Sequence, residues 1–239
     1  FDGLHSGHQK LFELAKKYKT KYKSKVGVVT FDPIPKMFFN TKIKNYRISN
    51  FNQKVIYLKK FGVDFVINKK FDKKFSKINY HKFIKDILSR KLRSKFIFVS
   101  NNFRFGHKRE GDVSKLKKYE SDFGYILINP VPLMKNKKII SSTVIRKLLE
   151  DGKLLKANTY LKRNWGIEGK VQRGRMMGQK IGFPTCNIDI DDYVIAKPGV
   201  YGVKIRINDR RKFYKGIANL GYRPTFNQKK ILLEVNIFN

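Results

Sequence analysis

The chain has 239 residues, of which 41% are hydrophobic and 14% aromatic, and this composition excludes a disordered protein. No stretch approaches the roughly 20 consecutive apolar residues of a membrane span, and no charged-then-apolar leader precedes Phe1, so we expect no membrane partner. Cys186 is the single cysteine and cannot form an internal disulfide, which indicates a reducing, cytoplasmic location.

The formal net charge is +36. Such a charge can attract nucleic acid or steer phosphorylated ligands toward a site. It can also reflect a composition biased toward Lys, Asn, Ile, Phe and Tyr, with the lysines on solvated faces. The lysines are dispersed, as in the pairs at 16–17, 59–60, 73–74, 117–118 and 229–230, so we favour the second interpretation and expect no nucleic-acid partner.

In the first 150 residues, short apolar segments alternate with amphipathic ones. The apolar segments predict strands at 25–31, 63–68, 95–100 and 125–130. The amphipathic segments predict helices at 7–22, 50–61, 79–92 and 113–121. This alternation predicts an α/β fold with a parallel sheet and helices on both faces, whose ligands bind beyond the carboxyl ends of the strands.

A helical stretch at 142–162 precedes a change in composition. From Trp165 onward, glycines and prolines punctuate alternating segments such as "VYGVKIRI", which predict antiparallel strands in a β-barrel or sandwich. We therefore expect two domains, residues 1–160 and residues 161–239. The sequence carries no indication of the oligomeric state.

The segment "DGLHSGH" at 2–8 leads directly into a predicted helix. Gly3 and Gly7 allow the backbone to approach a ligand closely. A helix start presents free N–H groups and a positive dipole end, which together bind phosphate. His5 and His8 lie three residues apart and can both donate hydrogen bonds to phosphate oxygens. The alternative is a turn with two surface histidines.

The segment "ISSTVIRKLL" at 140–149 contains a second possible helix start. Ser141, Ser142 or Thr143 can cap the helix that follows, and Arg146 then lies one turn inside it. An arginine at a phosphate-facing helix start would stabilise a leaving pyrophosphate. The alternative is an ordinary capped helix with a solvated arginine.

Together these segments resemble the nucleotidylyltransferase superfamily, with its H-x-G-H and I-S-S-T-x-x-R motifs. The whole chain resembles the bacterial bifunctional riboflavin kinase/FAD synthetases. The matching segments, in the order of that family, are "FDGLHSGH", "VVTFDPIPKMFF", "NNFRFGHKREGD", "ISSTVIR", "GFPTCNI", "PGVYGVKI", "GIANLGYRPTF" and "LEVNIF".

For the first domain, the resemblance implies a Rossmann-like nucleotidylyltransferase fold that transfers the adenylyl group of ATP to FMN and releases pyrophosphate. His5 and His8 would hold the ATP phosphates in the transition state. Arg146, with Ser142 and Thr143, would hold the polyphosphate. Asn102 matches a family position near the nucleotide and flavin, and its alternative is an ordinary loop amide.

For the second domain, the resemblance implies a riboflavin kinase-like β-barrel that phosphorylates riboflavin to FMN with ATP. Thr185 and Asn187 match the family positions that hold Mg²⁺ and the ATP phosphate, and both offer the hard oxygen ligands that Mg²⁺ prefers. Glu234 matches the family base that takes the proton of the ribityl hydroxyl. Gly174, Gly178 and Gly182 suit a loop that covers the nucleotide.

At both ends the sequence departs from the family. A strand normally precedes the F-D-G segment and further strands normally follow the "LEVNIF" segment, so we expect a fragment whose kinase domain is incomplete. One alternative is therefore an FMN adenylyltransferase with an inactive kinase remnant. A remote alternative is a basic RNA-binding protein, because H-x-G-H also occurs in class I tRNA synthetases.

Overall fold

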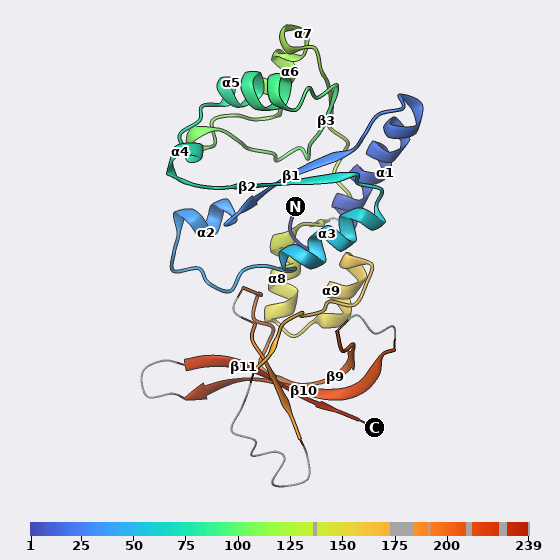
Figure 1. Cartoon of the computed structure of the whole chain (residues 1–239), viewed down its shortest axis with the longest axis vertical. Helices are drawn as coiled ribbons and strands as arrows, with labels where there is room; N and C mark the ends of the chain where they lie inside the picture. The colour runs from blue at the N-terminus through green and yellow to red at the C-terminus, as the bar shows by residue number, and fades with distance from the viewer. Residues whose placement is uncertain (136–137, 173–183, 191, 209–211, 225–228, 239) are drawn as a thin grey trace. The chain divides into compact units, whose positions relative to one another are not determined.

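The computed structural model describes residues 1–135, 138–172, 184–190, 192–208, 212–224 and 229–238 (Figure 1). The chain divides into two compact units. The first comprises Phe1, Gly3–Ile43 and Lys54–Ser141, and the second comprises Asp2, Lys44–Gln53 and Ser142–Asn239. Within the described ranges, no helix is long and apolar enough to span a membrane.

Parallel strand pairs and short helices make up most of the first unit. The strands are β1 Gly27–Asp32, β2 Phe65–Lys70, β3 Phe96–Phe98, β4 Ile126–Ile128, β5 Met134–Lys135 and β6 Lys138–Ile139. The helices are α1 Ser6–Lys21, α2 Pro35–Phe39, α3 Phe51–Lys60, α4 Lys73–Ser76, α5 Tyr80–Lys82, α6 Val113–Lys118 and α7 Glu120–Phe123, with a π-helix at Phe83–Lys91 and a 3₁₀ turn at His107–Arg109.

The four strands predicted from apolar segments are present, but they pair two by two. β1 lies parallel to β2, with Val28 opposite Val66, and β3 lies parallel to β4, with Ile97 opposite Leu127. The α/β class is thus confirmed. The single parallel sheet is not seen among the described strands, and β3 and β4, of three residues each, offer only short ladders for further pairing.

Two apolar clusters stabilise this unit. One packs α1 and α3 against the first strand pair, through Leu4, Phe12, Val28, Leu58 and Val63. The other packs the π-helix and α6 against the second pair and contains Phe83, Ile84, Ile97, Val99, Phe105, Leu116 and Tyr125. At the start of α3, the side-chain oxygens of Asn50 and Gln53 each accept the backbone N–H of the other residue. This reciprocal pair fixes the first turn of the helix.

The predicted helices at 79–92 and 113–121 form with changes. The first is a short α5, capped by the Asn79 side chain, that continues as the π-helix. The second divides at Tyr119, whose backbone (φ −99°, ψ 14°) leaves helical geometry between α6 and α7. The segment 142–162 likewise forms two helices, α8 Ser142–Glu150 and α9 Leu154–Leu161.

The second unit adds a five-stranded antiparallel sheet to α8 and α9. Its strands are β7 Val171–Gln172, β8 Cys186–Ile188, β9 Gly199–Ile205, β10 Tyr214–Pro224 and β11 Lys229–Ile237, and the spatial order is β7-β8-β11-β10-β9 (Figure 1). The expected closed barrel is wrong for the described strands. A barrel requires its first and last strands to pair, whereas β7 and β9 end the sheet without pairing to each other.

The segment Lys44–Gln53 belongs to the second unit although it lies early in the sequence. The backbone N–H groups of Tyr46 and Arg47 donate to the carbonyl of Asp192, at 3.1 and 2.7 Å. The Trp165 indole N–H donates to the carbonyl of Ile48 at 2.9 Å. These long-range bonds could not be foreseen from local patterns.

Helix α9 offers a matched test of core packing. Leu161 is fully buried, whereas Leu155 on the same helix is 85% exposed. We expect Leu161→Ala to lower the free energy of unfolding by about 2–5 kcal/mol, because a cavity replaces the side chain. Leu155→Ala should change it by less than about 0.5 kcal/mol. Denaturant unfolding followed by circular dichroism measures both, and equal losses would contradict the packing.

Candidate functional site

His5 and His8 lie together at the start of α1. His5 is the residue just before the helix and is only 5% exposed, and its ring stacks on that of His8 with centroids 3.7 Å apart. Helix geometry leaves the N–H groups of the first turn without intrahelical acceptors. The two stacked imidazoles therefore lie at the start of the helix, and the burial of His5 contradicts the alternative of a turn with two surface histidines.

The two glycines of this segment have different roles. Gly3 has a φ of +74°, the left-handed region that glycine adopts without strain. At Gly7 the requirement is space. A Cβ atom there would lie 3.2 Å from the His5 ring and 3.4 Å from the carbonyl oxygen of Ile140. A side chain at position 7 would thus press on the histidine pair.

Two polar atoms in this cluster are buried without a protein partner. The Ser6 hydroxyl and the Nδ1 atom of His8 form no hydrogen bond within the part of the chain that the structure describes. Ser6 is 3% exposed. Because buried polar atoms in folded proteins are nearly always hydrogen-bonded, these two indicate a place for a polar ligand.

The electrostatics of His8 favour its neutral form. Burial, followed by the neighbouring His5 and then other positive charges that include Lys54, lowers the pKa of His8 well below its ordinary value of 6.5. At neutral pH His8 is therefore an uncharged imidazole. A neutral imidazole can donate one N–H and brings no positive charge of its own.

Helix α3 contains a buried lysine whose charge is among those that lower the pKa of His8. Lys54 of α3 is 2% exposed, and its ammonium donates to the hydroxyl of Thr30 on β1 at 3.1 Å. Sequence inspection missed both residues. The available signal was spacing, because Lys54 precedes the fully buried Leu58 by four residues and so shares its face of α3.

In the second unit, Arg146 is held by Asp2, another residue that motif reading missed. Its Nη2 donates to the Asp2 carboxylate at 2.6 Å, its Nε donates to the carbonyl of Tyr46 at 2.8 Å, and its guanidinium lies 3.6 Å from the centre of the Tyr46 ring. Asp2 also accepts the backbone N–H groups of Ile48 and Ser49. The predicted alternative of a solvated arginine is wrong, since Arg146 is 8% exposed.

The remaining candidates of the first domain are partly exposed. Ser142 begins α8 and its hydroxyl donates to the carbonyl of Asp2 at 2.8 Å, while Thr143 is exposed and Ser141 half-buried. Asn102 is exposed in a turn and accepts the Ser100 hydroxyl at 2.9 Å.

A polar row crosses the antiparallel sheet. Glu234 on β11 lies directly opposite Asn187 on β8 and Asn219 on β10, and Asn187 in turn lies opposite Gln172 on β7. Directly opposite residues of antiparallel strands share one face of the sheet. The predicted residues Asn187 and Glu234 are thus brought together, and Asn219 joins them without having been singled out from the sequence.

Asn187, like Ser6 and His8 at α1, carries a buried polar atom without a hydrogen-bond partner among the described residues. It is 8% exposed, and its Oδ1 is buried without a hydrogen-bond donor among the described residues. Thr185 is exposed two residues earlier, and Gly174, Gly178 and Gly182 lie outside the described residues. In the described ranges no group of three or more His, Cys, Asp or Glu side chains could hold a metal ion.

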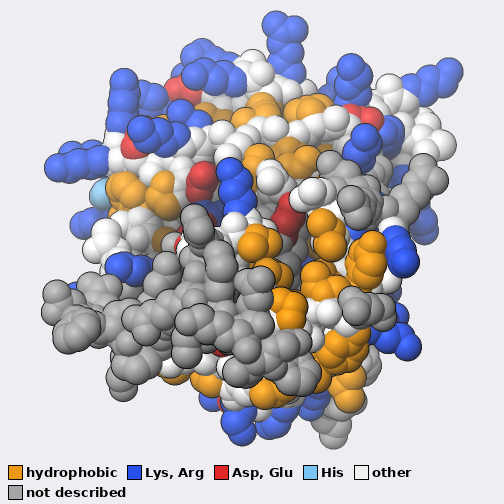
Figure 2. Space-filling view, turned by 60° about the horizontal axis from the view of Figure 1, so that its bottom comes forward, with side chains coloured by type: hydrophobic (Ala, Val, Ile, Leu, Met, Phe, Trp, Pro, Cys, Tyr) orange, Lys and Arg blue, Asp and Glu red, His pale blue; other side chains and the backbone are white. Residues whose placement is uncertain are grey.

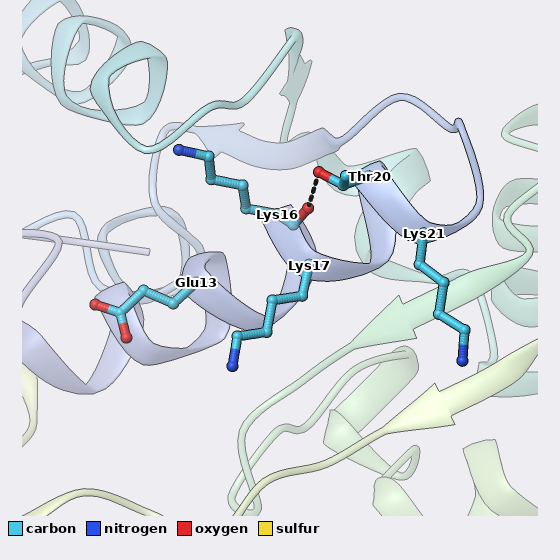
Figure 3. Close-up of a pocket in the computed structure, with 5 residues that line it drawn as sticks. All are labelled: Glu13, Lys16, Lys17, Thr20 and Lys21. Atoms are coloured by element: carbon cyan, nitrogen blue, oxygen red, sulfur yellow. Dashed lines mark hydrogen bonds between the residues drawn. The ribbon is translucent and has the colours of Figure 1, made fainter.

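A separate hollow of about 650 Å³ lies along α1, away from the histidines. It is lined by Glu13, Lys16, Lys17, Thr20 and Lys21, whose charged ends point apart (Figure 3). The face drawn in Figure 2 shows Lys and Arg side chains scattered over the surface. Neither feature gathers groups for a reaction.

The Asp2–Arg146 pair provides a test of stability. Asp2→Asn keeps the shape of the side chain but leaves the buried guanidinium without its carboxylate, and we expect the free energy of unfolding to fall by about 3–5 kcal/mol. The control is Asp151→Asn, which removes a pair with the exposed Lys147 at 2.8 Å and should leave the unfolding midpoint unchanged. Equal midpoints for the two variants would contradict a structural role for the pair.

The lowered pKa of His8 predicts a pH dependence. Below about pH 6.5 the unfolded chain protonates this histidine while the folded chain does not, so acidification lowers the free energy of unfolding. Denaturant titrations at about pH 7.5 and about pH 5.5 measure the loss, and the loss should shrink in His8→Gln. An NMR titration midpoint of His8 at or above 6.5 in the folded protein would refute the expectation.

Comparison with known proteins gives these sites their context. The family model described as FAD synthetase matches residues 1–144, and the model described as riboflavin kinase matches residues 161–239. A bifunctional riboflavin kinase/FMN adenylyltransferase of Buchnera aphidicola is 40% identical over 243 residues, which cover 100% of this chain and 77% of the relative. The Escherichia coli K12 protein of the same name is 35% identical and covered to 76%.

A solved structure titled macrolide-efflux protein from Streptococcus pneumoniae is also similar. It has a TM-score of 0.85 and 30% identity, and the match covers 100% of this chain and 77% of that one. The two family models follow each other along the chain, and the relatives match it from end to end. The chain therefore belongs to the family of bifunctional riboflavin kinase/FMN adenylyltransferases.

Proposed function

We propose that this chain acts in FAD biosynthesis, phosphorylating riboflavin to FMN in residues 161–239 and adenylylating FMN to FAD in residues 1–160. The observation that carries the proposal is the match of both family models in this order. The clustered polar groups on α1 and on the antiparallel sheet support one reaction each. ATP is a substrate of both reactions.

In the adenylyl transfer, a phosphate oxygen of FMN attacks the α-phosphorus of ATP. The bond from that phosphorus to the bridging oxygen breaks, and pyrophosphate leaves with the electron pair. The attacking phosphate is already ionised, so binding and charge stabilisation supply the catalysis. His5, His8 and the first-turn amides of α1, next to Gly3 and Gly7, would hold the polyphosphate.

Arg146 has a more constrained role than its motif alone implies. In the described part of the chain its hydrogen bonds use Nε and Nη2, so Nη1 is the nitrogen available for a phosphate oxygen. We therefore propose that Arg146 binds polyphosphate through one nitrogen while Asp2 fixes its orientation. Ser141, Ser142 and Thr143 at the start of α8 and Asn102 in its turn remain proposed nucleotide contacts, supported by the family motifs.

In the kinase reaction, the ribityl hydroxyl attacks the γ-phosphorus of ATP and ADP leaves. Glu234 would accept the hydroxyl proton as the new bond to phosphorus forms. Asn219 and Asn187, on either side of it, would orient this carboxylate and the phosphate. Gly174, Gly178 and Gly182 are proposed to line the nucleotide loop.

The residues present fit a magnesium ion. The orphaned Oδ1 of Asn187 and the exposed hydroxyl of Thr185 are hard oxygen ligands of the kind that Mg²⁺ takes alongside phosphates and waters. Mg²⁺ bound there would neutralise phosphate charge. We further propose a Rossmann-like arrangement of the first domain and a cytoplasmic location, the latter because the chain has a single cysteine.

The two reactions can be separated by mutation. We expect Glu234→Gln to lower FMN formation about 10²–10⁴-fold with FAD formation from FMN unchanged, because it removes only the base. His5→Asn should lower FAD formation about 10²–10³-fold and spare FMN formation. Product chromatography with each flavin substrate measures both rates.

Glu150→Gln, an exposed change on α8, and His81→Asn on α5 serve as matched controls and should leave both rates unchanged. Full activity of Glu234→Gln in FMN formation would refute the base. FAD formation without any FMN formation by the unaltered chain would support an adenylyltransferase with an inactive kinase remnant. Salt-sensitive RNA binding with no flavin turnover would favour the nucleic-acid alternative.

A further inference from the structure

Asn236 occupies a strand position that strand preference does not explain. It follows Glu234 by two residues on β11, so the two side chains lie on the same face of the sheet. Asparagine is depleted in strands, and the residues next to it, Val235 and Ile237, are apolar. Asn236 is also half-buried. Neither strand preference nor simple exposure to solvent therefore accounts for an amide at this position.

The side-chain amide of Asn236 reaches the neighbouring segment of the sheet. Its Nδ2 donates to the carbonyl oxygen of Pro184 at 2.8 Å, across a separation of 52 residues in the sequence. Pro184 immediately precedes Thr185, whose exposed hydroxyl is one of the two proposed magnesium ligands. The bond therefore holds the backbone directly beside that ligand.

The register of the sheet agrees with this contact. Glu234 on β11 lies opposite Asn187 on β8, and the described antiparallel ladder between the two strands ends one pair later. One step forward along β11 is one step back along β8. Extending the register by one further position puts Thr185 opposite Asn236. Asn236 thus stands to Thr185 as the proposed base stands to Asn187.

Thr185 lies just beyond the ladder and gains from a separate anchor. β8 begins at Cys186, so the described ladder does not include Thr185. Hydrogen bonds to the segments that carry metal ligands orient those ligands and strengthen metal binding. β11 is a firm base for such a bond, because a Cβ atom at Gly216 of β10 would overlap the carbonyl oxygen of Asn236. The two strands are therefore in close contact at this position.

We propose that Asn236 is a positioning residue of the kinase site, an inference that rests on the proposed function. Its amide holds the Pro184 carbonyl and so fixes the position of Thr185. The Thr185 hydroxyl and Asn187 Oδ1 can then bind one magnesium ion together. Asn236 acts through this segment and does not itself bind the metal. One strand, β11, would thus carry both the base Glu234 and the anchor of a metal ligand.

The test is a double-mutant cycle that combines Asn236→Leu with Thr185→Val. Leu keeps nearly the size of the asparagine side chain without its donor, and Val keeps the shape of threonine without its hydroxyl. We expect Asn236→Leu to weaken Mg²⁺ binding in the presence of ADP about tenfold in calorimetry. Because Asn236 acts through Thr185, the double variant should bind Mg²⁺ within about twofold of Thr185→Val alone.

The Mg²⁺ dependence of FMN formation provides a second measure. In Asn236→Leu the Mg²⁺ concentration for half-maximal rate should rise about tenfold, whereas the rate at saturating Mg²⁺ should stay within about threefold. Asn164→Leu removes an exposed amide from the same unit and should stay within about twofold on both measures. FAD formation from FMN serves as an internal control and should be unchanged in every variant.

The outcomes separate this inference from the proposed function. Weaker Mg²⁺ binding in Thr185→Val but not in Asn236→Leu would overturn the inference and leave the proposed function intact. Losses that add in the double variant would give Asn236 a role independent of Thr185 and would also overturn it. Unchanged Mg²⁺ binding in Thr185→Val would refute the magnesium ligand, and the inference with it.

A measurement on the unaltered chain decides the matter if Asn236→Leu fails to fold or if the chain forms no FMN. Adding Mg²⁺ and ADP should shift the side-chain NH₂ signals of Asn236 and the methyl signal of Thr185 in NMR spectra, whereas the NH₂ signals of Asn164 should not move. A shift of Thr185 without any shift of Asn236 at saturating ADP would overturn the inference. No shift of Thr185 would refute the magnesium ligand on which it rests.

Discussion

The second unit depends on the hydrogen bonds and the ion pair that the Asp2 carboxylate forms. It joins three segments that lie far apart in the sequence, since it accepts the N–H groups of Ile48 and Ser49 and the Arg146 guanidinium. Buried carboxylates are tolerated only when such donors satisfy them. One side chain thus fixes both the segment Lys44–Gln53 and the start of α8. Asp2 lies in the same segment as His5 and His8, which suggests a catalytic role. Its contacts instead indicate that it holds segments of the second unit together.

Both proposed sites retain buried polar atoms that the described protein does not satisfy. The Ser6 hydroxyl and His8 Nδ1 are such atoms at α1, and Asn187 Oδ1 is one on the antiparallel sheet. Each unsatisfied group costs roughly 1–3 kcal/mol, so the fold gives up stability at these places. A ligand recovers that free energy on binding if it forms hydrogen bonds with the Ser6 hydroxyl and His8 Nδ1, or brings a donor or a cation to Asn187 Oδ1. The cost of these unsatisfied atoms and the affinity for substrate would therefore have the same origin.

Periodicity and motif spacing predicted the local structure well and the long-range contacts poorly. The 3.6-residue period of α1 and α3 and the apolar segments of β1 to β4 are local signals, and these elements are confirmed within a few residues. The motif spacing also predicted that His5 and His8 would meet.

The closed barrel was wrong, because closure depends on which edges pair and not on alternation along one strand. Asp2 and Lys54 were missed because the contacts that distinguish them are with residues 46 and 24 positions away. For Lys54, the four-residue spacing to Leu58 already placed a charge on a buried face.

Strand register determines whether Glu234 is placed where it could act as the proposed base. On β11 the residues flanking Glu234, Leu233 and Val235, are 9% and 4% exposed, and they lie opposite the buried Leu220 and Ala218 of β10. Because side chains alternate between faces, a slip of one residue would bury Glu234 and expose its apolar neighbours. The apolar pairs therefore do more than stabilise the sheet. They hold Glu234 between Asn187 and Asn219, so that hydrophobic pairing on one face sets the position of the proposed base on the other.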